Sequence, residues 1–186
     1  MRWELLFGDL ETQMEAVSQQ DLERRINELA RIETSRLTLA EALRGAMDSQ
    51  LSIIMKTGTV FHGQLRRVET EWVLLEEGSR SVLLPVGMIS RVSGLGIQRA
   101  SAPSKVPYTF AAALRVLARN RSMLVLELDS ARQATTRGVL DQVGADYVQL
   151  LQLSDGVSRV RDNSQGSIVV PMAAMVSLAS GADNEF

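Results

Sequence analysis

Residues 63–92 read GQLRRVETEWVLLEEGSRSVLLPVGMISRV, and the second half of the chain repeats this stretch. Residues 138–150, GVLDQVGADYVQL, match its beginning at a constant offset of 75 (138 − 63). Its end returns as SIVVPMAAMVSL, in which Pro171 takes the place of Pro85 at an offset of 86 (171 − 85). A period of about 70–86 residues is too long for a solenoid and predicts a small duplicated unit.

A helix is expected before each copy of the repeat. Residues 38–41, TLAE, form a capping box, in which the Thr hydroxyl and the Glu carboxylate bind free backbone N–H groups. The second copy keeps the cap residue at Thr109, but Ala112 replaces the Glu. Another helix is expected over residues 9–34, as a docking arm or packed against the body, and we leave these two alternatives open.

Five short runs rich in aliphatic and β-branched residues follow each expected helix. Gly63 and Gly138 lie inside such runs, where glycine marks a bend or a close backbone approach. Pro85 and Pro171 are expected to end the fourth strand. We therefore predict an α+β fold with an N-terminal amphipathic helix and two tandem units, each one helix plus a five-stranded small β-barrel. The expected boundaries are 1–35 for the N-terminal helix, 36–95 for copy 1, 96–108 for a linker, 109–180 for copy 2 and 181–186 for a tail.

A helix followed by five strands, with G-x-L-x-x-V leading into the third strand, resembles the Sm-like (LSm) small-barrel superfamily. That resemblance implies two fused Sm-like barrels, and a pore-type RNA site would need an Asn at the positions held by Val73 and Val148. PRC-barrels are a second family of similar size with a strand-ending proline. The opening segment WELLFGDLE also resembles an uncharacterised actinobacterial family, which implies no activity.

Composition excludes several classes of chemistry. The chain has 186 residues, no cysteine and one histidine, so disulfides, catalytic thiolates and His- or Cys-ligated metal sites are not expected. We expect no cofactor and no catalytic residue. Acidic residues interrupt the first eleven positions, and no apolar run approaches the ~20 residues of a membrane helix. We therefore expect a cytoplasmic protein that does not bind membranes.

Two groups of residues are candidates for binding. Trp72 and Tyr147 open the third strand of each copy, and Glu71 and Asp146 precede them, so these four are candidate partner-binding residues. Strand alternation places the aromatic residues on the less buried face, where we expect packing within their own unit, with an interface as the alternative. The nucleic-acid candidates are the arginines of the first copy and of the second helix: Arg66, Arg67, Arg115, Arg119 and Arg121.

Charge is uneven along a chain of net charge −2, because residues 99–137 hold seven basic residues against Glu127 and Asp129. Such asymmetry can mark a partner surface. The duplicated architecture without a reactive constellation favours a non-enzymatic protein-binding or scaffold protein, with a protein partner or self-association. The alternative is RNA or single-stranded nucleic-acid binding through the Arg-rich region, although the aromatic residues that stack on bases are scarce.

Overall fold

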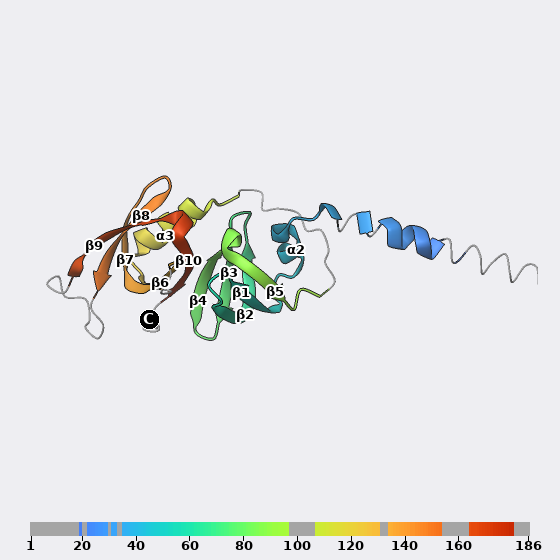
Figure 1. Ribbon diagram of the computed structural model, residues 1–186, viewed down its shortest axis with the longest axis horizontal. Helices are drawn as coiled ribbons and strands as arrows, with labels where there is room; N and C mark the ends of the chain where they lie inside the picture. Colours follow the sequence, from blue (N-terminus) through green and yellow to red (C-terminus); the bar gives the residue numbers. More distant parts are fainter. Residues whose placement is uncertain are drawn as a thin grey trace, which may run out of the picture. The chain divides into compact units, whose positions relative to one another are not determined.

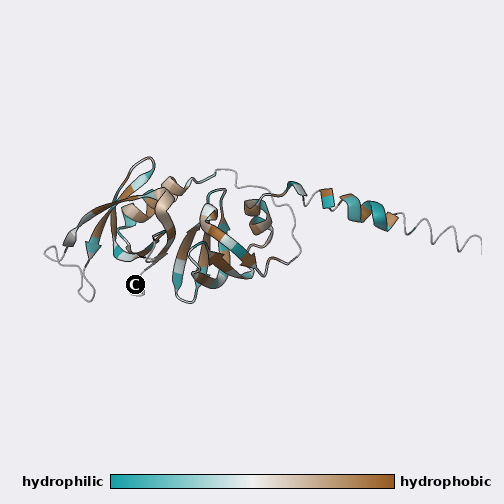
Figure 2. Cartoon of the chain, viewed as in Figure 1, coloured by the Kyte–Doolittle hydropathy of each residue, from teal (hydrophilic) through white to brown (hydrophobic). Residues whose placement is uncertain are grey.

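A computed structural model describes residues 19, 22–29, 31–32, 35–96, 107–130, 134–153 and 164–180. The chain divides into two compact units, residues 1–38 and 39–186. In the first unit residues 22–29 are helical, within the span for which the sequence predicts a helix. Leu22, Ile26 and Leu29 on this helix are exposed among hydrophilic neighbours (Figure 2). The WELLF segment lies outside the described residues, and so does most of the predicted linker.

Two helices and ten strands form the described part of the second unit. A first repeat holds α2 (Leu39–Gly45), β1 (Gln50–Met55), β2 (Val60–Val68), β3 (Trp72–Glu77), β4 (Arg80–Pro85) and β5 (Ile89–Ser93). A second repeat holds α3 (Phe110–Asn120), β6 (Met123–Leu128), β7 (Thr135–Val143), β8 (Tyr147–Leu153), β9 (Ser164–Pro171) and β10 (Met175–Ser180). One 3₁₀ turn follows each proline-terminated strand: η1 (Val86–Met88) and η3 (Met172–Ala174).

All ten strands form a single open sheet in the order β5-β1-β2-β3-β4-β10-β6-β7-β8-β9 (Figure 1). Every pair in it is antiparallel. The predicted pair of closed barrels is therefore wrong, and with it the α+β class and the resemblance to Sm-like barrels. The physical reason lies at β4. Closure of the first repeat would need β4 to pair with β5, but the backbone of β4 pairs with β10 instead.

Backbone details recur between the two repeats. The N–H of Val86 donates to the carbonyl of Glu71 (2.8 Å), and that of Met172 donates to the carbonyl of Asp146 (2.7 Å). The β2–β3 and β7–β8 pairs shift register at matching points, next to Arg67 and Gln142. Both repeats thus share one strand order and the irregularity between their second and third strands.

Two glycines permit the close approach of neighbouring strands. A Cβ atom on Gly63 would lie 2.4 Å from the carbonyl oxygen of Glu76, and one on Gly138 would lie 2.1 Å from that of Leu151. Since real Cβ atoms do not approach backbone oxygens so closely, only glycine fits at these positions. Of the two predicted alternatives for these glycines, a bend or a close backbone approach, the structure shows the close approach.

Strands β4 and β10 contribute to two hydrophobic cores on opposite faces of the sheet. Val82 and Ala179, which are paired, belong to the core of the first repeat, with Leu43, Ile53 and others. Leu83 and Leu178, the next pair, belong to the core of the second repeat, with Leu114 and others. Because successive side chains point to opposite faces, one strand pair closes both cores.

Replacing either close-approach glycine with alanine should destabilise the protein. We expect G63A and G138A each to lower the free energy of unfolding by about 2 kcal/mol, because the added methyl group forces the strands apart. The control is G87A, since a Cβ on Gly87 meets nothing within 4 Å. Chemical denaturation measures all three, and equal midpoints for G63A, G138A and G87A would contradict the assignment.

Candidate functional site

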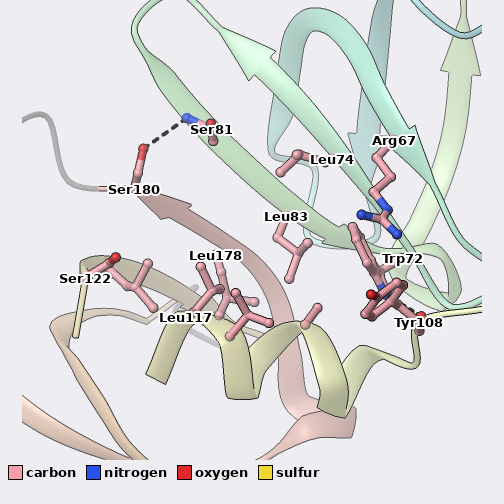
Figure 3. Close-up of a pocket in the computed structure, with 13 residues that line it drawn as sticks. Arg67, Trp72, Leu74, Ser81, Leu83, Tyr108, Leu117, Ser122, Leu178 and Ser180 are labelled. Carbon is pink, nitrogen blue, oxygen red and sulfur yellow. Dashed lines mark hydrogen bonds between the residues drawn. The ribbon is translucent and has the colours of Figure 1, made fainter. Parts of the chain in front are cut away.

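The junction between the two repeats is the most elaborate feature of the described fold. Only two residue pairs join β4 to β10, Leu83 with Leu178 and Val82 with Ala179. The N–H of Ser81 adds a hydrogen bond to the Ser180 hydroxyl at 2.9 Å (Figure 3). So short a strand pairing needs further contacts on both sides, and side chains provide them.

Trp72 is the aromatic anchor of this junction. It is 5% exposed and packs in the core of the second repeat, although it belongs to the first. Its indole N–H donates to the carbonyl of Tyr108 at 2.9 Å. The prediction of a less buried face and of packing within its own unit is wrong for Trp72, because the second repeat covers that face.

Arg67 covers the exposed side of this anchor. Its guanidinium carbon lies 5.6 Å from the ring centre of Trp72 and 4.7 Å from that of Tyr108, which are cation–π distances (Figure 3). Arg67 also donates to the buried carboxylate of Glu69 at 2.9 Å. The arginine is thus fixed by two rings and one carboxylate within the junction.

Two carboxylates of the first repeat bind the chain that enters α3. Glu69 accepts from the N–H of Tyr108 at 3.3 Å, and Glu71 accepts from the N–H of Phe110 at 2.6 Å. The Thr109 hydroxyl accepts from the N–H of Ala112, so the predicted cap residue is confirmed. The second copy has Ala112 where the capping box of the first has a Glu, so α3 lacks that carboxylate. Glu71 of the first repeat supplies a carboxylate at the start of α3 instead.

A buried carboxylate joins the repeats at a third point. Glu127 on β6 is buried and accepts from the hydroxyls of Thr57 (2.8 Å) and Thr59, which lie in the turn between β1 and β2. Its second oxygen accepts from Ser177 at 3.1 Å. Nothing in the local sequence identifies Glu127 as a junction residue, because its partners are about 50–70 positions away in the chain.

A cavity of about 370 Å³ lies beside the junction. Its wall is mainly apolar and comes from both repeats, with Arg67 and Trp72 at one end and Leu117 and Leu178 further along (Figure 3). A second hollow, of about 500 Å³, brings Glu71 and Asp146 together beside the start of α3. The structure thus places these two predicted residues at one site, and Trp72 and Tyr147 at different ones.

The free end of the sheet repeats the surface that the junction buries. Tyr147 pairs with Pro171 as Trp72 pairs with Pro85, so Tyr147 occupies the position of Trp72. In the same register, Val169 occupies the position of Leu83. Yet Tyr147 is 42% exposed against 5% for Trp72, and Val169 is 63% exposed against 6% for Leu83. The face of β8 and β9 around Tyr147 and Val169 is called the free face below.

Several predicted nucleic-acid residues have contacts within the protein. Arg66 pairs with Glu76 and with Asp48 (3.2 Å), and Arg115 donates to the carbonyl of Gly144 at 3.1 Å. Arg67 lies in the junction, whereas Arg119 and Arg121 are exposed at the end of α3. The structure does not gather the five arginines at one site, and RNA binding stays a prediction.

Ion pairs on the surface of β2–β4 shift the pKa values of two charged side chains, Arg66 and Glu77. The hydrogen bond to Glu76, with the attraction of both carboxylates, raises the pKa of Arg66. Burial alone would raise the pKa of Glu77, but the His62 backbone N–H (3.0 Å) and the Arg80 guanidinium hold that pKa below its usual value. These ion pairs join neighbouring strands and the Asp48 turn on one surface of the first repeat.

Within the described residues, no group of three or more His, Cys, Asp or Glu side chains could hold a metal ion. The helices of the described part of the chain are too short or too polar to cross a membrane. Comparisons with protein-family models, curated proteins and solved structures found no match to this chain. The resemblance to an actinobacterial family therefore has no support from these comparisons.

Removing the carboxylate of Glu127 should weaken the junction. We expect E127A to lower the free energy of unfolding by about 3 kcal/mol, because three hydroxyl groups lose a charged acceptor away from water. D129A, which changes an exposed carboxylate two residues away, should change it by less than about 0.5 kcal/mol. Denaturant titration compares them, and a value for E127A near that of D129A would contradict a structural role for Glu127.

Proposed function

We propose that this chain is a non-enzymatic protein-binding protein that takes up a strand of its partner at the free edge of β9. The observation that carries the proposal is the contrast between equivalent positions. Leu83 is buried because a neighbouring strand and helix cover it, and Val169 at the same place in the second repeat is open. A surface that the fold buries once, and presents again uncovered, has the properties of a binding face.

The composition of β9 supports this role. Residues 168–170 are Ile-Val-Val, an uninterrupted apolar run of the kind found in strands covered on both faces. Val170 is buried in the core of the second repeat, whereas Val169 points to the opposite face of the sheet and is exposed. Residues 166–171 contain no charged side chain, whereas proteins commonly place lysine or another charge on an edge strand to prevent pairing. Between Gly166 and Pro171 the edge is thus uncharged and mainly apolar.

In strand addition, affinity for the partner and selectivity among partners come from different groups. Main-chain hydrogen bonds to the edge give affinity for any extended segment, and side-chain pockets on the face select its sequence. At the free face the selecting side chains are Tyr147 and Val169, and Gln149 on β8 lies opposite Val169. An aromatic anchor beside an aliphatic side chain favours a partner strand with an apolar residue opposite Val169.

Placing a charge on the free face should abolish partner binding. We expect V169K to lose the proteins that the immobilised wild-type chain retains from its native cell extract, because lysine at this position opposes strand pairing. V60K is the matched control, since Val60 is another exposed valine, on β2 of the first repeat. Mass spectrometry identifies the retained proteins, and circular dichroism checks that both variants fold.

The same experiment tests the alternative. Nuclease treatment of the extract should leave the retained set unchanged if the contacts are between proteins. Loss of that set on nuclease treatment, or identical sets for V169K and the wild type, would overturn the proposal. The first of these results would favour nucleic-acid binding, whose affinity should fall steeply with salt concentration.

A further inference from the structure

We propose that the partner strand is β5 of a second copy of this chain, which pairs with β9 in the register that β10 takes on β4. This inference rests on the proposed function, since it names the partner for the same free face. The molecule already contains one such contact, between its two repeats. The second copy would extend the sheet by repeating that contact between chains.

The free strand β5 has the local structure of β10. Each follows a proline-terminated strand and a single 3₁₀ turn, η1 or η3. Each pairs on one side with the first strand of its repeat: Val92 lies opposite Ile53 in β1, and Leu178 lies opposite Leu126 in β6. The other side of β10 binds β4, and the other side of β5 is an end of the sheet. Thus β5 presents the kind of edge that β10 presents to β4.

At the other end of the sheet, β9 has the local pairing of β4. β9 pairs with β8 as β4 pairs with β3, with Val169 opposite Gln149 where Leu83 is opposite Leu74. In the internal junction Leu83 faces Leu178 and Val82 faces Ala179. Transferring that register by the offset of 86 places Val169 of one copy opposite Val92 of the next, and Ile168 opposite Ser93. The first of these pairs is aliphatic on both sides, as it is in the junction.

The contact between copies would also bury side chains that are exposed in a single copy. Trp72 and Leu83 of the first repeat belong to the core of the second repeat. By the same geometry, Tyr147 and Val169 of one copy would join the core of the first repeat in the next copy, where Val92 is already partly buried. The exposed aromatic and aliphatic side chains of the free face would then be covered, and both end strands of the sheet, β9 and β5, would be paired at once.

The two edges that meet are different, so the association is head-to-tail. Such contacts produce a closed ring if the rotation between copies closes, and a filament if it does not. The intermolecular contact should be weaker than the internal one. Gly94 stands where Ser180 receives the N–H of Ser81, so that hydrogen bond has no counterpart.

Association of the full chain tests this directly. We expect analytical ultracentrifugation over about 1–100 µM to show mass increasing with concentration, and V169K to weaken the association at least tenfold. V60K should associate like the wild type. A wild-type chain that stays monomeric over this range would overturn the inference.

Cross-linking tests the register. The chain has no cysteine, so introduced thiols are the only ones present. We expect the double variant V92C/V169C to form a ladder of covalent multimers on mild oxidation or with a short bismaleimide, and V92C or V169C alone to form none. Efficient dimers of V169C alone would show that two β9 strands meet symmetrically, and would contradict the head-to-tail register.

The outcomes separate the two proposals. If the chain stays monomeric but V169K still loses proteins captured from the extract, the free face binds another protein and only the inference of self-association fails. If V169K changes neither association nor capture, the proposed function fails as well.

Discussion

One short strand pair holds the larger unit together. β4 and β10 share two residue pairs, and these alternate between the two cores, Val82 with Ala179 on one face and Leu83 with Leu178 on the other. Neither core is complete without both strands. The sheet therefore cannot open at this point without exposing apolar side chains of both repeats, and this links their stabilities more tightly than two main-chain pairings would.

Around this pair, polar contacts make the junction specific. Trp72 donates to a carbonyl, Glu71 binds the first N–H of α3, and Glu127 collects three hydroxyl groups. Each is a buried or partly buried polar group whose partner lies about 35–70 residues away in the chain. Because an unpaired polar group is costly inside a protein, these contacts favour one alignment of the repeats over a shifted one.

The free face shows the same strands without those contacts. Tyr147 lies over Gly144, the residue that replaces Glu69. Val169 pairs with Gln149 on β8, and among the described strands none pairs with the other side of β9. The difference between Leu83 and Val169 is thus a difference in neighbours, since both are aliphatic residues in equivalent strands. The exposed position on β9 therefore has an aliphatic side chain like that of Leu83 on β4, but not the cover that Leu83 has.

The sequence by itself determined the features that depend on local chemistry or on self-similarity along the chain. These are the repeat, the five strands after each helix, the prolines that end β4 and β9, and the Thr109 cap. Sequence also marked Trp72, Tyr147, Glu71 and Asp146 as positions of interest. Only the tertiary structure decided that β4 pairs with β10 and that the sheet stays open. Strand pairing is made by backbone groups that every residue carries, so side chains alone do not distinguish closure of one repeat from joining to the next. The burial of Trp72 and the exposure of Tyr147 follow from that choice of partner.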